Sequence, residues 1–293
     1  MRRGRYYLGR VMKLGRLDQG LLIDAIVKSP TVSIGKYDWT ITDVVDKRSE
    51  IPFVFGKLSK FAKEGYVTIV DTDAKSQVDE PTENLLIASA PFVYLPDYSG
   101  VAYLHVWNQI QEDVFPRRFK AIIEAAYNHF FVDCTVEPIS DYEAFTTKLR
   151  EIGTFTEISA NVHPPNPLFG RLWDSLKEYI EKRQASELLV KEVSGSNNGI
   201  QTNIISLMVG ILENPRFDPA TPPDITDAAL LMAADGYGKG KVVGERNGRQ
   251  IVIRTSETKK NFLFDKEPSP DELAQEAHRH FAQINQEREL RHS

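Results

Sequence analysis

Residues 235–260 read DGYGKGKVVGERNGRQIVIRTSETKK, a stretch that joins a turn signal to two strand patterns. Asn247-Gly248 is the strongest short signal for a two-residue β-hairpin turn, because both positions tolerate a positive φ. Apolar residues recur on both sides of this turn, as they do in antiparallel strands with one buried face. The turn sets the register, and the predicted cross-strand pairs are Arg246–Arg249, Glu245–Gln250, Gly244–Ile251, Val243–Val252, Val242–Ile253 and Lys241–Arg254. The stretch therefore predicts a β-hairpin that is apolar at its root and basic at its tip and flank.

Positive charge gathers in this hairpin, although the whole chain has a formal net charge of −5. Its seven cations are Lys239, Lys241, Arg246, Arg249, Arg254, Lys259 and Lys260. Between residues 239 and 260 they are opposed by Glu245 and Glu257, so the segment carries +5 and the rest of the chain −10. Like charges facing each other across two strands repel unless an anion neutralises them or the side chains point apart into water. The hairpin therefore predicts either a surface for an anionic partner or an ordinary solvated ribbon.

Length and composition indicate a globular protein with two domains. The chain has 293 residues, of which 41% are hydrophobic and 26% charged, and this length favours two domains of ordinary size. No apolar run approaches the roughly 18 residues that indicate a membrane span, and the basic N-terminal segment lacks the apolar core of a secretory signal. The single cysteine, Cys134, excludes an internal disulfide and fits a reducing compartment. We expect a cytoplasmic protein in which Cys134 is a small core residue.

Strand and helix patterns follow one another along the chain. Period-two patterning rich in β-branched and aromatic residues predicts strands at residues 5–14, 32–48, 51–61, 65–72, 84–95, 100–107, 133–139, 154–162 and 186–194. Amphipathic patterns and capping residues predict helices at residues 18–29, 109–130, 141–152, 168–183, 200–213, 225–235 and 269–290, the last with Ser269 or Asp271 as its N-cap. The acidic, proline-containing residues 71–84 predict a loop.

The order of these elements predicts the α+β class. In the middle of the chain it resembles a ferredoxin-like layer, in which helices cover one face of an antiparallel sheet. Residues 194–199, SGSNNG, are small or turn-forming and make the best linker candidate. We therefore expect an α+β core domain at residues 1–194 and a C-terminal module of helices and the basic hairpin at residues 195–293. This module shares a sheet with the N-terminal strands if it folds back onto them.

The C-terminal third resembles a known family. Residues 230–257 (LLMAADGYGKGKVVGERNGRQIVIRTSE) and 262–284 (FLFDKEPSPDELAQEAHRHFAQI) are similar to the C-terminal region of RexA-type phage-exclusion proteins, and closer still to a related bacterial family of unknown function. The shared pattern is an alanine-rich helix, an acidic-glycine turn, a basic hairpin and a terminal helix. The resemblance covers roughly residues 160–285.

This resemblance implies a cytoplasmic, homodimeric, two-domain protein of phage defence by abortive infection. Such a protein binds double-stranded DNA largely without sequence preference and works with a membrane-protein partner. The seven hairpin cations stand where such a protein would contact DNA phosphates. The acidic net charge of the whole chain is a departure, because it argues against a broadly basic DNA clamp.

A metal-dependent nuclease is an alternative that the same segment supports. Asp235, with Glu257 and Lys259 further on, matches the loose D…ExK pattern in which carboxylates hold a divalent cation and a lysine lies near the attacking water. The pattern is short, and Asp235 falls at the end of a predicted helix, where the dipole disfavours an acid. A third interpretation is a protein-interaction adaptor that docks the hairpin tip on an acidic partner or adds its strand to a partner by edge pairing.

Histidines, glycines, one tyrosine and further cations are the remaining candidates for binding. We predict no cofactor and no metal site, because the six histidines lack metal-ligand spacing, and the glycines of the hairpin lack P-loop spacing. Tyr237 is the one aromatic candidate for stacking on a base. The remaining cations, which either extend the basic track or belong to a solvated chain end and a helix face, are Arg2, Arg3, Arg5, Arg10, Arg117, Arg118 and Lys120.

Overall fold

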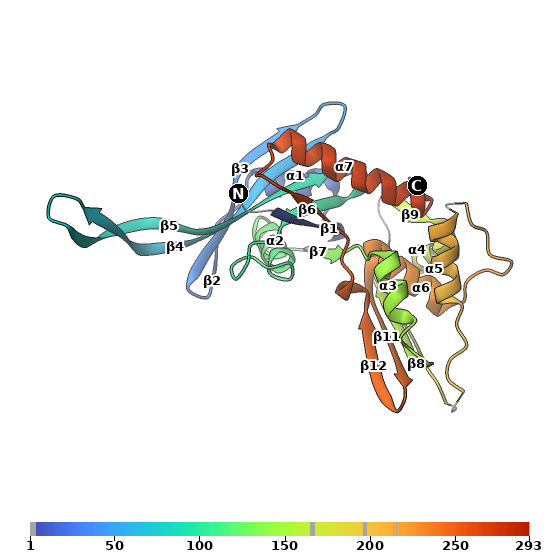
Figure 1. Ribbon diagram of the computed structural model, residues 1–293. Helices are drawn as coiled ribbons and strands as arrows, with labels where there is room; N and C mark the ends of the chain where they lie inside the picture. The colour runs from blue at the N-terminus through green and yellow to red at the C-terminus, as the bar shows by residue number, and fades with distance from the viewer. Residues whose placement is uncertain (1–3, 165–167, 196–197, 215, 293) are drawn as a thin grey trace.

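The computed structural model describes residues 4–164, 168–195, 198–214 and 216–292, and it is a mixed α+β structure built on antiparallel sheets (Figure 1). Within these ranges the first sheet has the strand order β13-β1-β6-β5-β4-β3-β2, and β7 pairs with the second half of β1. Its strands are β1 (Gly4–Gly15), β2 (Val32–Ile34), β3 (Tyr37–Lys47), β4 (Phe53–Asp71), β5 (Ser76–Leu95), β6 (Gly100–Leu104), β7 (Val132–Pro138) and β13 (Asn261–Phe264). The sheet curls like part of a barrel.

Helices cover both faces of this first sheet. Successive residues of a strand point to opposite faces, so Val54 packs with the helices α1 (Gln19–Val27) and α2 (Val114–Ala125). Its neighbour Phe55 faces the cluster that holds the last helix, α7 (Pro270–Glu287). The predicted cap of that helix is confirmed, because the Ser269 hydroxyl accepts from the backbone of Glu272 while the Glu272 carboxylate accepts from the backbone of Ser269.

The second sheet has the order β10-β8-β11-β12 in the described residues. Its strands are β8 (Thr154–Val162), β10 (Leu188–Val193), β11 (Gly238–Arg246) and β12 (Arg249–Arg254). One face is buried, and the helix α6 (Ile225–Met232) packs on β8. The other elements of this half are α3 (Tyr142–Leu149), α4 (Asp174–Lys182), α5 (Ile204–Glu213) and the paired short strands β9 (Leu168–Gly170) and β14 (Leu290–His292).

The basic hairpin forms as predicted. Strands β11 and β12 pair in the predicted register at all six positions, from Arg246–Arg249 at the tip to Lys241–Arg254 near the root. Asn247 and Gly248 have φ values of 54° and 72°, the positive values that the two-residue turn requires. The hairpin projects away from the first sheet (Figure 1).

Two predictions about the fold were wrong. The strands expected in one ferredoxin-like layer are divided, because β7 joins the first sheet whereas β8 and β10 belong to the second. Residues 71–84 are not a loop: the chain turns at residues 72–75 and then forms β5, which pairs with β4 to the end of a long arm (Figure 1). In addition, β13 pairs with β1, so strands that follow residue 195 lie in both sheets. None of the described helices is both long and apolar enough to cross a membrane.

Candidate nucleic-acid interface

The face of the second sheet that is turned away from its helices carries a row of polar side chains. The strand register places Arg254, Lys241, Ser159 and Lys191 next to one another across the four strands. Lys239 lies two residues before Lys241 and therefore points to the same side. We call this surface the open face. Its underside is apolar and buried, with Ile158, Val242 and Ile253 in the core.

A shallow hollow of about 280 Å³ lies on the open face. Lys239, Lys241 and Arg254 line it together with the polar residues Asn161 and Ser256. Three of the seven predicted cations therefore converge on one place. The sequence did not reveal the contribution of β8 and β10, because β8 pairs with the hairpin strand β11 across a long separation in the sequence, and β10 joins the sheet only through β8. The alternation of apolar and polar residues over positions 186–194 predicted a strand, and this was the only sequence signal that bore on Lys191.

Carboxylates of the same chain already neutralise much of the open face. Glu157 forms ion pairs with Lys241 and, at 3.0 Å, with Lys191. Their hydrogen bonds lower the pKa of Glu157 below its ordinary value, so this carboxylate is charged at neutral pH. Arg254 lies 3.5 Å from Glu257. The repulsion expected between Lys241 and Arg254 is thus relieved within the chain, without an external anion.

Lys239 reaches a buried carboxylate at the edge of this face. Its Nζ atom lies 3.5 Å from Glu137 Oε1, while the rest of the Lys239 side chain is exposed. Burial raises the pKa of Glu137 to about 7, against which the lysine charge acts in the opposite direction. The charge of the open face therefore depends on pH in the neutral range.

The tip of the hairpin is different. Arg246 and Arg249 are exposed, and within the described ranges neither forms an ion pair with a carboxylate. Arg246 Nη1 donates a hydrogen bond to the backbone oxygen of Glu151, at 3.4 Å. These two arginines are consequently the hairpin cations most available to an anionic ligand.

Two predicted cations lie away from the open face. Lys259 is 3.6 Å from Glu112, which lies between β6 and α2. Lys260 is 3.2 Å from Asp141 at the start of α3. Both side chains are largely buried. They were grouped with the hairpin by their position in the sequence, but the chain leaves the hairpin after Arg254 and turns back to the first sheet.

The residues of the nuclease alternative contact separate sets of partners. Asp235 is only 2% exposed, and its carboxylate accepts hydrogen bonds from Tyr142, Trp173 and Arg288. Glu257 is paired with Lys148 and Arg254, and Lys259 with Glu112. No cluster of three metal-binding side chains occurs in the part of the chain that the structure describes.

Tyr237 and Arg10 are buried rather than available for binding. The Tyr237 ring packs 5.5 Å from the ring of Trp173, and the Arg10 guanidinium lies 5.1 Å from the centre of the Tyr237 ring. Both residues are 0% exposed, which overturns the idea that Tyr237 stacks on a base. Cys134 is buried, as predicted, and burial raises its pKa well above the usual range. Arg2 and Arg3 lie outside the described residues.

The glycine-rich start of β11 has a packing role. A Cβ atom at Gly238 would lie 2.0 Å from the backbone oxygen of Asn161 on β8. Because that neighbour is backbone, the two strands pair here only if residue 238 lacks a side chain. The spacing of these glycines thus reflects sheet pairing, which agrees with the rejection of a P-loop.

No protein-family model matches the chain, and no curated protein matches it at a significant level.

Proposed function

We propose that this protein binds double-stranded DNA largely without sequence preference, with the tip of the hairpin as its principal phosphate contact. The observation that supports this most directly is the pair Arg246 and Arg249, which face each other across the turn without a carboxylate partner in the described residues. A guanidinium donates two parallel hydrogen bonds to a phosphate, and a two-stranded ribbon fits the major groove of DNA.

The cations of the open face act as a second, weaker layer in this proposal. Arg254 is exposed and lies 3.5 Å from Glu257, which is itself partly exposed. Exposed ion pairs contribute at most about 1 kcal/mol, so a phosphate can take the place of the carboxylate at little cost. Counterion release by the two tip arginines predicts a plot of log affinity against log salt with a slope of roughly −2 per chain. If all seven predicted cations contacted phosphate, the slope would be about −6.

The biological setting is also part of the proposal. The pattern shared with RexA-type proteins over residues 160–285 supports a role in cytoplasmic phage defence, as a homodimer that acts with a membrane-protein partner. DNA occupancy would then be the signal that this assembly passes on. Phage plating efficiency on cells that express the wild type or the hairpin variant described next tests this part.

The experiment is a salt-titrated gel shift with random-sequence duplex DNA, in Mg²⁺ and in EDTA. We expect Arg246→Ala/Arg249→Ala to abolish the salt-sensitive shift while leaving the circular dichroism spectrum unchanged. The matched control is Arg48→Ala/Arg279→Ala, which removes two exposed arginines outside the hairpin. Unchanged DNA affinity in the hairpin variant would contradict the proposal. Cleavage of the DNA in the Mg²⁺ lanes alone would favour the nuclease.

A further inference from the structure

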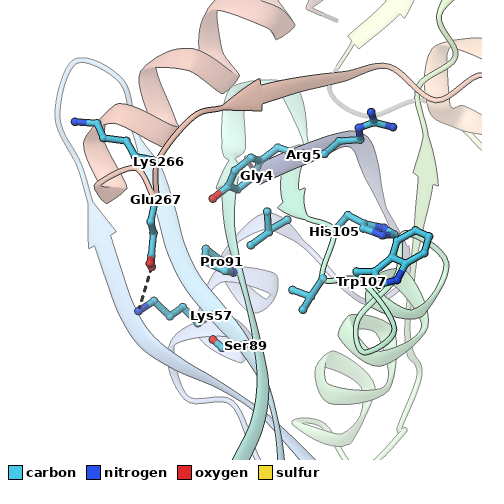
Figure 2. A pocket seen from close by; sticks show the side chains of 12 residues that line it. Gly4, Arg5, Lys57, Ser89, Pro91, His105, Trp107, Lys266 and Glu267 are labelled. Atoms are coloured by element: carbon cyan, nitrogen blue, oxygen red, sulfur yellow. Dashed lines mark ion pairs between the residues drawn. The ribbon is translucent and has the colours of Figure 1, made fainter. Parts of the chain in front are cut away.

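A large cavity lies at the first sheet, apart from the hairpin. It has a volume of about 860 Å³, within the range of small-molecule sites, and lies where β1 begins and β6 ends (Figure 2). Strands β4 and β5 and the loop between β13 and α7 complete its wall. A neighbouring hollow of about 440 Å³ shares Arg5, His105 and Trp107 with it. These three residues therefore stand at the junction of the two spaces.

Trp107 presents an aromatic surface at this junction. It is 75% exposed, whereas Trp39 and Trp173 are 3% and 1% exposed. The short turn that carries it is fixed by the backbone hydrogen bond from Val106 to Ile110 at 2.8 Å, and its ring lies 5.8 Å from that of His105. An exposed indole on a fixed turn is a surface on which a planar ring can stack.

Arg5 supplies an available positive charge beside this ring. Its backbone oxygen accepts from the backbone N–H of His105 at 2.9 Å, which places the two residues next to each other (Figure 2). The Arg5 side chain has no carboxylate partner in the described ranges. Glu112, which lines the neighbouring hollow, lies 2.8 Å from His105 and 3.6 Å from Lys259, so its charge is neutralised locally.

The opposite wall offers polar groups. Ser89 Oγ is shielded from solvent and has no hydrogen-bond partner among the described residues. Lys57 lies near it, 2.9 Å from Asp43 and 3.9 Å from Glu267. Figure 2 shows Ser89 and Lys57 across the cavity from His105 and Trp107. A shielded hydroxyl without a partner costs free energy, and rotation of the Ser89 side chain toward the cavity would let a polar atom of a ligand recover it.

We propose that this cavity binds a nucleotide, with its base stacked on Trp107 and its phosphate held by the Arg5 guanidinium. A ligand that is aromatic at one end and anionic at the other satisfies both groups at once. Ser89 then receives a hydrogen bond from, or donates one to, the sugar or the base edge. The nucleotide is either free or an unpaired residue of a nucleic-acid strand. This site is separate from the hairpin, so the inference does not rest on the proposed DNA binding.

The test is equilibrium dialysis of labelled AMP, adenosine and a short single-stranded oligonucleotide against the full chain, with tryptophan fluorescence as a second readout. Trp107 is the exposed tryptophan of the three, so stacking on it quenches the accessible emission. We expect AMP or the oligonucleotide to bind at least about tenfold more tightly than adenosine, because a charged hydrogen bond to phosphate is lost in adenosine. Binding of AMP identifies a free nucleotide, and binding of the oligonucleotide alone identifies an unpaired residue of a strand.

Variants separate the two contacts. Trp107→Ala should weaken binding of every ligand about tenfold, whereas Arg5→Ala should weaken AMP or oligonucleotide binding about tenfold and leave adenosine unchanged. Both side chains are exposed, so both variants should fold, which circular dichroism checks. Arg48→Ala/Arg279→Ala, which changes neither the cavity nor the hairpin, is the control and should bind as the wild type does. The proposal is overturned if neither AMP nor the oligonucleotide binds, if adenosine binds as tightly as AMP and the oligonucleotide, or if both cavity variants bind normally.

Discussion

Arg288 Nη1 lies 2.7 Å from Asp235 Oδ1, and this buried ion pair ties the end of the last helix to the start of the basic hairpin. The same carboxylate accepts from Tyr142 at 2.8 Å and from Trp173 at 2.9 Å. The Arg288 guanidinium also lies 3.8 Å from the centre of the Tyr142 ring. Asp235 therefore joins elements from both halves of the chain. Its three partners satisfy the hydrogen bonding and the charge of the carboxylate, so no metal is needed to explain this buried acid.

We predict that Asp235→Ala lowers the free energy of unfolding by about 3–5 kcal/mol, because it leaves the Arg288 charge buried and unpaired. Urea denaturation measures this change. The double variant Asp235→Ala/Arg288→Ala should lose much less than the sum of the two single changes, since neither charge is then stranded. A stable Asp235→Ala protein would contradict this prediction and revive the catalytic interpretation of Asp235.

Glu137 should make stability depend on pH. Burial raises its pKa from the ordinary 4.5 to about 7 in the folded protein, although Lys239 acts against this. Below pH 4.5 both the folded and the unfolded chain hold the proton, and the contribution to stability is complete. As pH rises from 4.5 to 7 the unfolded chain releases the proton while the folded chain retains it, so stability falls, by about 3 kcal/mol in total.

The variant Glu137→Gln removes this titration and tests its sign. We expect the free energy of unfolding of the wild type, relative to the variant, to decline between pH 4.5 and 7 and to level off above pH 7. Chemical denaturation at a series of pH values measures both proteins. A relative stability that rises with pH in this window would show that the lysine charge, rather than burial, dominates at Glu137.

Glu157 sets how much of the open face is available to phosphate. It holds both Lys241 and Lys191, and its lowered pKa keeps it charged at neutral pH. We predict that Glu157→Gln strengthens binding of random duplex DNA about threefold to tenfold at low salt and steepens the salt slope. The control is Glu213→Gln, an exposed glutamate on α5. If wild type and Glu157→Gln bind DNA with equal affinity, the DNA contacts the hairpin tip and not the open face.

The sequence predicted what depends on local patterns. The register of the hairpin follows from Asn247-Gly248 and the alternation beside it, and the cap of α7 follows from Ser269 and Glu272. Both features are determined by residues within a few positions of one another, so a short segment of sequence is enough to predict them.

What the sequence did not predict depends on residues far apart in the chain. The acids that neutralise the hairpin, Glu137 and Glu157, belong to strands about 80 to 100 positions away, and no local pattern marks them as partners. The ion pair of Asp235 with Arg288 is hidden for the same reason. The division of the strands between two sheets likewise follows from how buried faces pack, which one sequence does not specify.

The arm formed by β4 and β5 gives a prediction about where stability resides. Between residues 63 and 86 no side chain of the arm is buried, whereas Leu58, earlier in β4, is 0% exposed. Replacing residues 64–83 with Asn-Gly removes the exposed part and closes the strands with a two-residue turn. Because no core contact is lost, we expect the melting temperature to change by less than about 4 °C, as for a loss below about 1 kcal/mol.

The contrasting variant is Leu58→Ala in the same strand, which should cost about 2–5 kcal/mol because it leaves a cavity in the core. Differential scanning calorimetry measures both proteins. The shortened protein should also retain its affinity for duplex DNA and for AMP, since neither the hairpin tip nor the Trp107 cavity includes residues 64–83. A large drop in melting temperature on shortening the arm would mean that the outer strands, in spite of their exposure, hold the first sheet together.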